Sequence, residues 1–234
     1  MIKSMADHLF SSVSRRKFLL IGSALGSALI APRLATTGQS SGSVAPAAAG
    51  PAPRTAGPIH ATKSRVVMLD AKPGPIAIDA KKTAVIVVDM QNDFGAKGGM
   101  FDHAGIDLSS IQRAIGPTSK VLASARHAGL RVIYLKMGFR SDLSDLGAPD
   151  SPNRERHLHF SVGKTMRAPD GREGRFLIRD TWNTDIIDEL KPKPDDVVIY
   201  KHRFSGFYQT ELDSILKKQD IKYLVVTGCV RSSQ

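Results

Sequence analysis

Three residues with reactive side chains each follow a hydrophobic run that is typical of a buried strand. Asp89 follows TAVIVV, Lys201 follows DVVIY, and Cys229 follows YLVVTG. A thiol needs a base or a nearby cation to become a nucleophilic thiolate at neutral pH. Asp89 could accept that proton, and Lys201 could keep the carboxylate charged. Together the three groups could transfer an acyl group, because the thiolate can attack a carbonyl carbon and the acid can protonate the leaving amine.

The segments around these residues predict the elements that would position them. β-branched runs predict strands covered on both faces, and apolar residues at helical spacing predict helices between the strands. Elements alternating in this order form a parallel sheet whose strands end at one shared edge. We therefore expect Asp89, Lys201 and Cys229 to meet in one cleft. The strands are predicted at 83–90, 131–137, 196–202 and 221–228, and the helices at 109–130, 184–191 and 210–220.

Each of the three residues also has a purely structural interpretation when it is taken alone. Asp89 could be an acid that ends a strand or caps a helix, and Lys201 could be a solvated surface lysine. Cys229 could be a small buried hydrophobic residue, the commonest role of a lone cysteine. Their joint placement at the ends of three predicted strands favours the catalytic interpretation.

The N-terminal part of the chain has the composition of an export signal followed by a linker. In SRRKFLLIGSALGSALIA, paired arginines precede an apolar run that is shorter than the about 20 residues needed to span a bilayer. This segment resembles a twin-arginine signal, although a basic N-terminus without a role in export is the alternative. We expect a signal at 1–35, a linker rich in Ala, Pro, Gly and Ser at 36–63, and a folded domain at 64–234. Export would place the protein in the periplasm or cell envelope, with no membrane span in the mature chain.

The net charge of +11 does not predict a nucleic-acid-binding surface. Residues 1–82 hold 11 of the 33 Lys and Arg residues but 3 of the 22 Asp and Glu residues, so most of the basic excess precedes the predicted domain. A single cysteine excludes an internal disulfide framework and a zinc site built from several thiolates. No glycine-rich phosphate-binding motif follows the first strand. We therefore expect no cofactor, no metal and no nucleic-acid partner.

Several motifs resemble the cysteine hydrolase, or isochorismatase-like, superfamily. AVIVVDMQNDF resembles its first motif, and SPNRERHLHFSVGKTMR and KHRFSGFYQTELDSIL are similar to its ureidoacrylate amidohydrolase branch. The resemblance extends over 83–228. It implies a doubly wound, Rossmann-like α/β fold, with a mostly parallel sheet and helices on both faces. It also implies an Asp–Lys–Cys mechanism for cleaving C–N bonds in small amide or carbamoyl compounds, and a homo-oligomer.

The position of the nucleophile has two possible assignments within this resemblance. The family motif resembles TGxxTxxCVEST, and counting without a gap from Gly228 places its cysteine at Gln234. CVRSS also resembles CVEST, which would make Cys229 the nucleophile after deletion of the preceding turn. On either assignment, relatives continue with a helix and a further strand. We therefore expect that the C-terminal part of the fold is missing from this chain and that its activity depends on that part.

Three functions remain open on the sequence alone. The first is hydrolysis of a small amide or carbamoyl compound through a thioester. The second is an isochorismatase-type reaction without a cysteine, in which Asp89 protonates a vinyl ether and water attacks. The third is a non-catalytic remnant that binds a ligand or partner. Met137 stands where ureidoacrylate-type relatives tend to have Asn, so the substrate also remains open.

Overall fold

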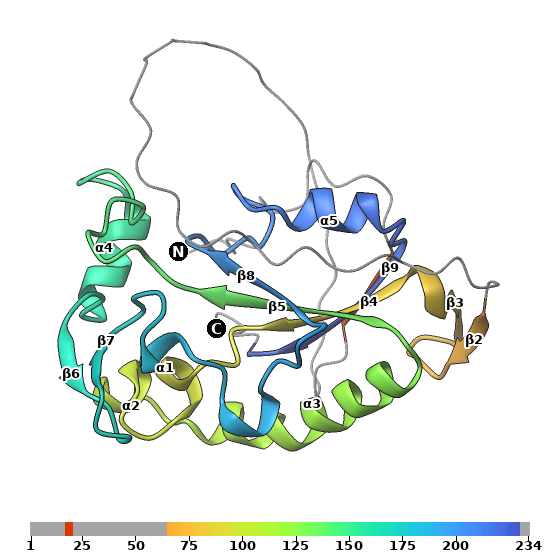
Figure 1. Cartoon of the computed structure of the whole chain (residues 1–234), viewed down its shortest axis with the longest axis horizontal. Coiled ribbons are helices and arrows are strands. Elements are labelled where there is room, and N and C mark those ends of the chain that lie inside the picture. The colour runs from red at the N-terminus through yellow and green to blue at the C-terminus, as the bar shows by residue number, and fades with distance from the viewer. Residues whose placement is uncertain (1–16, 21–64, 230–234) are drawn as a thin grey trace, which may run out of the picture.

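The central feature of the fold is a parallel sheet of five strands in the order β1-β9-β4-β5-β8 (Figure 1). The computed structural model describes residues 17–20 and 65–229, and only the backbone of 17–20. All four strand pairings are parallel. The strands are β1 (Lys17–Leu20), β4 (Thr83–Val88), β5 (Arg131–Met137), β8 (Val197–Lys201) and β9 (Tyr223–Gly228).

Helices cover both faces of this sheet, as a doubly wound fold requires. The chain crosses from β4 through α3 (Ser109–His127) to β5, and from β8 through α5 (Leu212–Lys218) to β9. Figure 1 shows α3 and α5 on opposite sides of the sheet. The strand order reverses between β4 and β9, and the carboxyl ends at such a switch point are the usual place for a ligand site. The predicted α/β fold class is therefore confirmed.

The strands carry hydrophobic residues on both faces because both faces are covered. Val85, Val132 and Val225 belong to the cluster packed with Leu122 of α3. Ile86, Ile133 and Ile199 belong to the cluster packed with Leu212 and Leu216 of α5. Successive side chains of a strand point to opposite faces, so the continuous β-branched runs supply both layers of the core.

The predicted helix at 184–191 is wrong. This stretch contains two short 3-10 turns, η3 (Trp182–Thr184) and η4 (Asp188–Leu190), with an extended segment between them. Ile186 forms an antiparallel bridge with Gln91, and the N–H of Ile187 donates to the carbonyl of Met90 at 3.0 Å. These long-range contacts outweigh the helical propensity of the segment, because they bury both isoleucines beside the end of β4.

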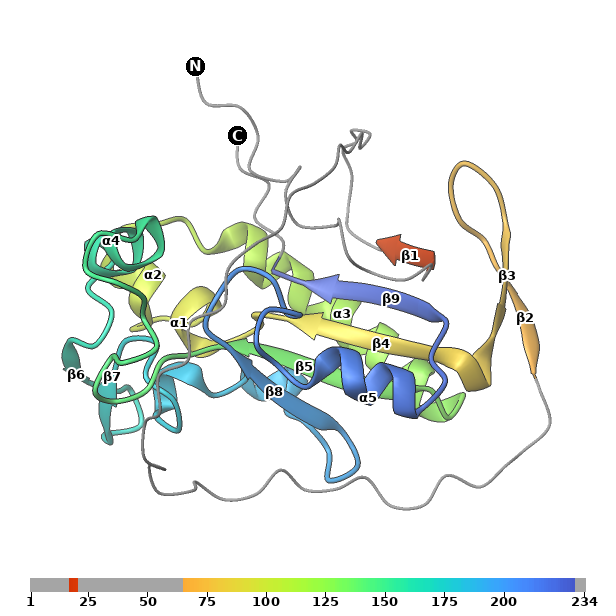
Figure 2. The same cartoon turned by 90° about the horizontal axis from the view of Figure 1, so that it is seen from above.

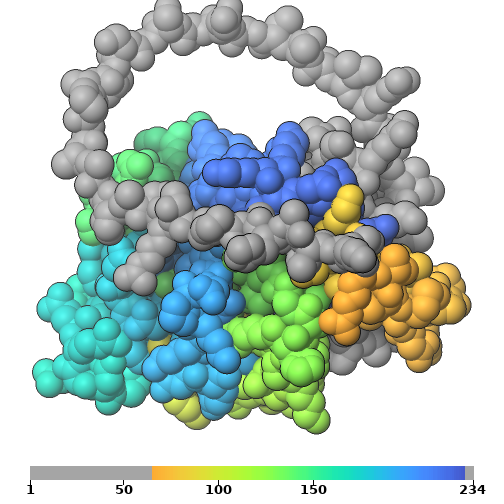
Figure 3. Space-filling model, turned by 45° about the vertical axis from the view of Figure 1, so that its right-hand side comes forward, coloured from red at the N-terminus to blue at the C-terminus, as the bar shows by residue number. Residues whose placement is uncertain are grey.

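Short elements surround the sheet at its two ends. The hairpin of β2 and β3 lies near the amino ends of the strands (Figure 1), and its residues lie at the edge of the molecule (Figure 3). η2 leads directly into β4, and the remaining short elements gather at the carboxyl ends of the strands (Figure 1). The elements are β2 (Val66–Leu69), β3 (Ile76–Asp79), η2 (Ala80–Lys82), α1 (Asn92–Gly95), α2 (Met100–His103), α4 (Pro152–His159), β6 (Thr165–Arg167) and β7 (Glu173–Arg175).

The predicted signal and linker fall almost entirely outside the described residues, as does Gln234. The exception is Lys17–Leu20, whose backbone pairs with β9 at the edge of the sheet, Lys17 opposite Tyr223 and Leu20 opposite Val226 (Figure 2). Its role in export remains a prediction. None of the helices in the described part of the chain combines the length and the apolar character needed to cross a membrane.

Candidate functional site

Asp89 occupies a strained backbone position at the end of β4. Its φ of 53° lies in the left-handed region, which non-glycine residues seldom adopt and which costs about 1–3 kcal/mol. Its N–H donates to the carbonyl of Leu135 on β5 at 2.9 Å, so the neighbouring strand holds the strained residue in place. Because of this reversal of φ, the side chain at 89 does not continue the alternation of β4.

The Asp89 side chain forms a buried ion pair with Lys201 at the end of β8. Lys201 Nζ donates to Asp89 Oδ2 at 2.8 Å, and the two side chains are 2% and 17% exposed respectively. The pair reaches across the end of β5, where the N–H of Gly138 donates to the carbonyl of Lys201 at 3.0 Å. A buried charge needs a partner of opposite sign, so each side chain compensates the charge of the other.

The second carboxylate oxygen of Asp89, Oδ1, is the atom of the ion pair that can take part in proton transfer. Asp89 Oδ1 is sealed from solvent and has no hydrogen-bond partner in the part of the chain that the structure describes. Lys201 anchors the other oxygen, which leaves Oδ1 able to accept a proton. A buried acceptor without a partner is unfavourable unless a ligand or reacting group supplies a donor. The carboxylate is therefore suited to general base and acid chemistry.

Gln91 fixes the end of β4 to the end of β5. Its Nε2 donates to the carbonyl of Met137 at 2.8 Å, and its Oε1 accepts from the N–H of Met137 at 2.7 Å. The residue is fully buried. The side-chain amide thus replaces a strand partner where the ladder between β4 and β5 ends. The sequence analysis missed Gln91, and its only signal is an amide two residues after the reactive acid.

Asp93 joins three of the segments that cover the site. Its Oδ1 accepts from the N–H of Met100 at 2.9 Å and from Asn183 Nδ2 at 2.6 Å, and its Oδ2 accepts from the N–H of Leu177 at 2.6 Å. Burial raises the pKa of Asp93 to about 7, although the three N–H donors act in the opposite direction. Asp93 is fully buried and positions the covering segments, a role that the sequence analysis also missed.

Cys229 follows β9 directly, and its backbone lies beside the end of β4. Its N–H donates to the carbonyl of Val88 at 2.9 Å, which places its backbone beside the residue that precedes Asp89. Its half-buried side chain packs against the apolar cluster between the sheet and α3. The structure therefore brings Asp89 and Lys201 into contact, while the thiol of Cys229 contacts hydrophobic residues.

The described residues offer no arrangement of three or more His, Cys, Asp and Glu side chains that could hold a metal ion. The donors that converge at this end of the sheet are one carboxylate, one ammonium group and backbone amides. Such a set can move protons and stabilise charge without a bound group.

Comparison with known proteins places these residues in a family context. The isochorismatase domain profile matches residues 83–232. Over 181 residues the chain is 41% identical to ureidoacrylate amidohydrolase RutB of Caulobacter segnis, covering 75% of this chain and 74% of the relative. It is 42% identical over 172 residues to the protein of that name from Methylorubrum extorquens, covering 71% and 68%. A cysteine hydrolase structure from Pseudomonas syringae is 35% identical with a TM-score of 0.53, covering 65% of this chain and 62% of that one.

Proposed function

The chain belongs to the isochorismatase family, and from this premise we propose that it hydrolyses a C–N bond in a small amide or carbamoyl compound. The contact of 2.8 Å between Lys201 Nζ and Asp89 Oδ2 carries this proposal. It anchors one oxygen of the carboxylate and leaves the second oxygen for proton exchange. The relatives at 41% and 42% identity support a ureidoacrylate-like substrate.

In the proposed reaction, Asp89 Oδ1 takes the proton of a thiol and the thiolate attacks the carbonyl carbon of the substrate. The C–N bond then breaks, and Asp89 gives its proton to the departing nitrogen. Water attacks the thioester, with Asp89 again as the base, which releases the acid and restores the thiol. Lys201 holds the carboxylate in position through these steps by its hydrogen bond to Oδ2.

The proposed mechanism needs a thiol near Asp89. Cys229 is the only cysteine of the chain, and its backbone lies next to the end of β4. Its side chain packs against the apolar cluster between the sheet and α3. The unpaired Oδ1 of Asp89 also supports the second candidate function, in which Asp89 protonates a vinyl ether and a water molecule attacks. That reaction needs the carboxyl group but no thiol.

Labelling with iodoacetamide tests whether Cys229 is the nucleophile. A thiol activated by Asp89 should label rapidly at neutral pH, and the rate should fall in the Asp89→Asn variant. Asp150→Asn is a matched control, because Asp150 is exposed on the surface. Slow labelling that is the same in all three proteins would exclude the thioester route through Cys229.

A substrate assay tests the proposed function itself. The full chain is incubated with a ureidoacrylate-like carbamoyl compound and, separately, with a vinyl ether. Ammonia is measured for the first compound, and the carbonyl compound and alcohol are measured for the second. Ammonia release that depends on Asp89 and Lys201 would support the amidohydrolase, and turnover of the vinyl ether alone would support the second function. A folded chain that converts neither compound would contradict both and favour a non-catalytic binding protein. A broad, non-cooperative melting curve would also favour such a remnant.

Export through a twin-arginine route is a separate proposal, supported by the SRRKFL motif. A reporter fused after residue 63 should reach the periplasm, and replacement of Arg15 and Arg16 by lysine should block that transport. Transport that is indifferent to this replacement would contradict the proposed route.

A further inference from the structure

A row of three aromatic rings leads from the surface to the interior beside Lys201. Phe204, in the loop after β8, is 49% exposed, His157 of α4 is 6% exposed, and Phe139 is fully buried. The His157 ring stacks on Phe204 with centroids 5.8 Å apart, and it meets Phe139 edge-on at 4.9 Å. His157 is therefore the single polar member of an otherwise apolar wall.

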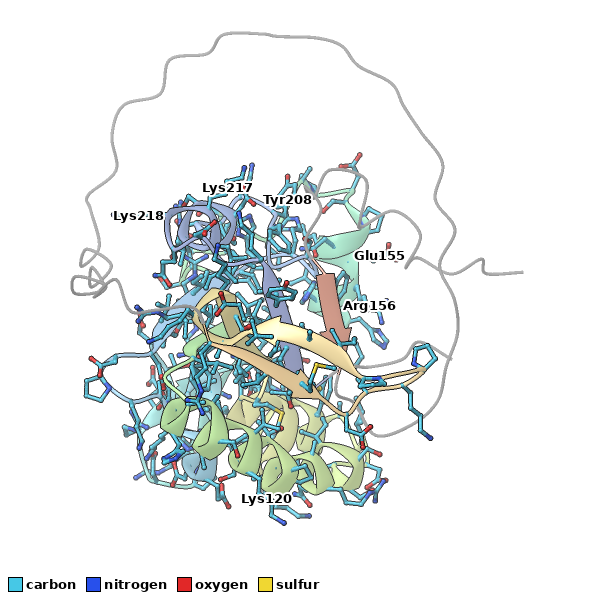
Figure 4. All side chains as sticks on the ribbon, turned by 90° about the vertical axis from the view of Figure 1, so that its right-hand side faces the viewer. Lys120, Glu155, Arg156, Tyr208, Lys217 and Lys218 are labelled. Atoms are coloured by element: carbon cyan, nitrogen blue, oxygen red, sulfur yellow. The ribbon has the colours of Figure 1, made fainter. Side chains whose placement is uncertain are left out.

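This wall lies close to the catalytic pair. Phe139 follows Gly138, whose N–H binds the carbonyl of Lys201, and the charge of Lys201 acts on His157. Arg156 and Arg203 flank the wall, and their charges act on His157. Arg156 can be followed in Figure 4, where it is labelled beside Glu155; Tyr208 of the loop after β8 is also labelled there. Burial is the largest cause that lowers the pKa of His157, and the three positive charges lower it further. These effects favour the neutral form of the imidazole.

The neutral imidazole is held in one tautomer. Nδ1 lies 2.6 Å from the carbonyl oxygen of Asn153. A carbonyl oxygen can only accept a hydrogen bond, so Nδ1 must carry the proton and Nε2 must be an acceptor. Nε2 has no hydrogen-bond partner among the described residues. On this 6% exposed side chain, Nε2 is therefore the ring nitrogen that has the capacity to accept a hydrogen bond from a ligand.

We propose that His157 is a specificity-determining residue whose Nε2 accepts a hydrogen bond from an N–H group of the substrate. The inference rests on the proposed function, since it concerns the amide or carbamoyl compound that the Asp89–Lys201 pair would cleave. An ester or ether of the same shape offers an oxygen lone pair in place of the N–H. That oxygen cannot donate, so the acceptor of His157 would lose its partner on binding.

This geometry explains how the site could separate the two candidate reactions. A vinyl ether has no N–H at the bond that breaks, whereas an amide does. Leaving a buried acceptor unpaired weakens binding by about tenfold or more. His157 thus favours amides over oxygen compounds without touching the proton that Asp89 transfers.

Binding of two matched probes to the full chain tests the inference. N-acetyl-β-alanine has one amide N–H, and 3-acetoxypropanoate has an ester oxygen in its place. Isothermal titration should show that the amide binds at least about tenfold more tightly. Side-chain ¹⁵N spectra of the histidines should show an unprotonated Nε2 at His157, and its resonance should move when the amide binds.

Three variants separate recognition from packing. His157→Phe keeps a ring between Phe139 and Phe204 and should remove the preference for the amide. His157→Gln supplies another acceptor and should retain part of that preference, so it serves if the phenylalanine variant does not fold. His159→Phe changes an exposed histidine of the same helix and should leave the preference unchanged.

The outcomes distinguish this inference from the proposed function. Equal affinity for both probes, or an unchanged preference in His157→Phe, would overturn the role of His157 while the amidohydrolase proposal stands. A protonated Nε2 in the free protein would do the same. If neither probe binds to a folded chain, both the inference and the substrate class on which it rests are overturned.

Discussion

At the scale of single residues, the Asp89–Lys201 contact should contribute both to the stability of the fold and to the rate of the reaction. Asp89→Asn removes the charge that compensates a lysine side chain with 2% exposure. Breaking a buried ion pair from one side costs about 3–5 kcal/mol, and loss of a general acid–base group lowers the rate by about 10²–10⁴-fold. We expect both effects, measured by urea unfolding and by the rate of amide hydrolysis.

Lys201→Met separates the two effects. Methionine fills the buried space without a charge, so it leaves Asp89 as the unpaired group. The carboxylate also loses the donor that anchors Oδ2, so activity should fall while the buried volume stays filled, as measured by the rate of amide hydrolysis. A variant that keeps full activity at neutral pH would show that the ion pair serves stability alone.

The raised pKa of Asp93 should make the stability of the fold depend on pH. Its pKa is about 7 in the folded protein against an ordinary value of 3.8, so the folded state binds more protons than the unfolded state between these values. The free energy of unfolding must then fall as the pH rises through this interval. The stabilising contribution is complete below the ordinary pKa and is lost as the pH rises through the folded-state pKa.

Asp93→Asn tests this dependence. Asparagine cannot titrate, so the variant should lose the slope between pH 4 and pH 7, as measured by urea unfolding at several pH values. Its Nδ2 would also face the N–H donor of Leu177 or another donor, which lowers the stability at every pH by about 1–3 kcal/mol. Exposed Asp150→Asn should retain the slope of the parent protein, and an unchanged slope in Asp93→Asn would contradict the assignment.

The sequence predicted the position of Asp89 and Lys201 at one edge of the sheet, because strand ends can be read from hydrophobic runs. Their contact depends on the left-handed φ of Asp89. Aspartate adopts this region more often than most residue types do, but that preference alone does not show which aspartate adopts it. Gln91 and Asp93 could not be predicted for a related reason. Their partners include backbone groups 46 and 84 positions away. Because nearly every residue has the same backbone groups, residue types do not reveal such partners.

At the scale of elements, the close approach of β9 to β4 depends on Gly228. Its φ is +121°, and a Cβ added there would lie 2.3 Å from the carbonyl oxygen of Val88. Real Cβ atoms do not approach backbone atoms this closely, so Gly228→Ala must move β9 away from the residue that precedes Asp89. We expect a loss of about 1–3 kcal/mol in the free energy of unfolding and reduced activity.

Gly116 of α3 provides the matched control for this substitution. A Cβ added at Gly116 meets no atom within 4 Å. Alanine is favoured over glycine inside a helix by about 0.5–1 kcal/mol, but the ring of Pro117 disfavours a Cβ at the preceding helical position. Gly116→Ala should therefore change the stability less than Gly228→Ala does. If thermal denaturation showed the same change in both variants, the close approach at Gly228 would not be the cause.

The elements that the sequence predicted well are those whose partners are fixed by the parallel topology. The strands and α3 follow from hydrophobic periodicity, and Gly129 ends the helical segment with a φ of +71° as a C-terminal glycine does. The segment 184–191 shows the limit of this method. TDIIDEL has helical spacing, but its isoleucines bond to Met90 and Gln91, which lie almost one hundred positions earlier.

At the scale of the whole molecule, the N-terminal segment contributes to the sheet. The backbone of Lys17–Leu20 pairs in parallel with β9 and occupies the edge of the five-stranded sheet (Figure 2). The same residues lie inside the predicted export signal. Removal of that signal would therefore leave the backbone of β9 without a strand partner on one side, and an unpaired edge favours association with other chains.

Hydrogen exchange can measure this coupling between the N-terminal segment and the domain. In a chain that starts at residue 36, alternate amides of Tyr223–Gly228 should exchange faster than in the full chain, because every second N–H of an edge strand loses its acceptor. The amides of β8, at the opposite edge of the sheet, serve as the internal control and should not change. Size-exclusion chromatography of the shortened chain should also show more self-association. Equal protection of β9 in both chains would mean that Lys17–Leu20 does not hold this edge in solution, and the export signal could then be removed without effect on the sheet.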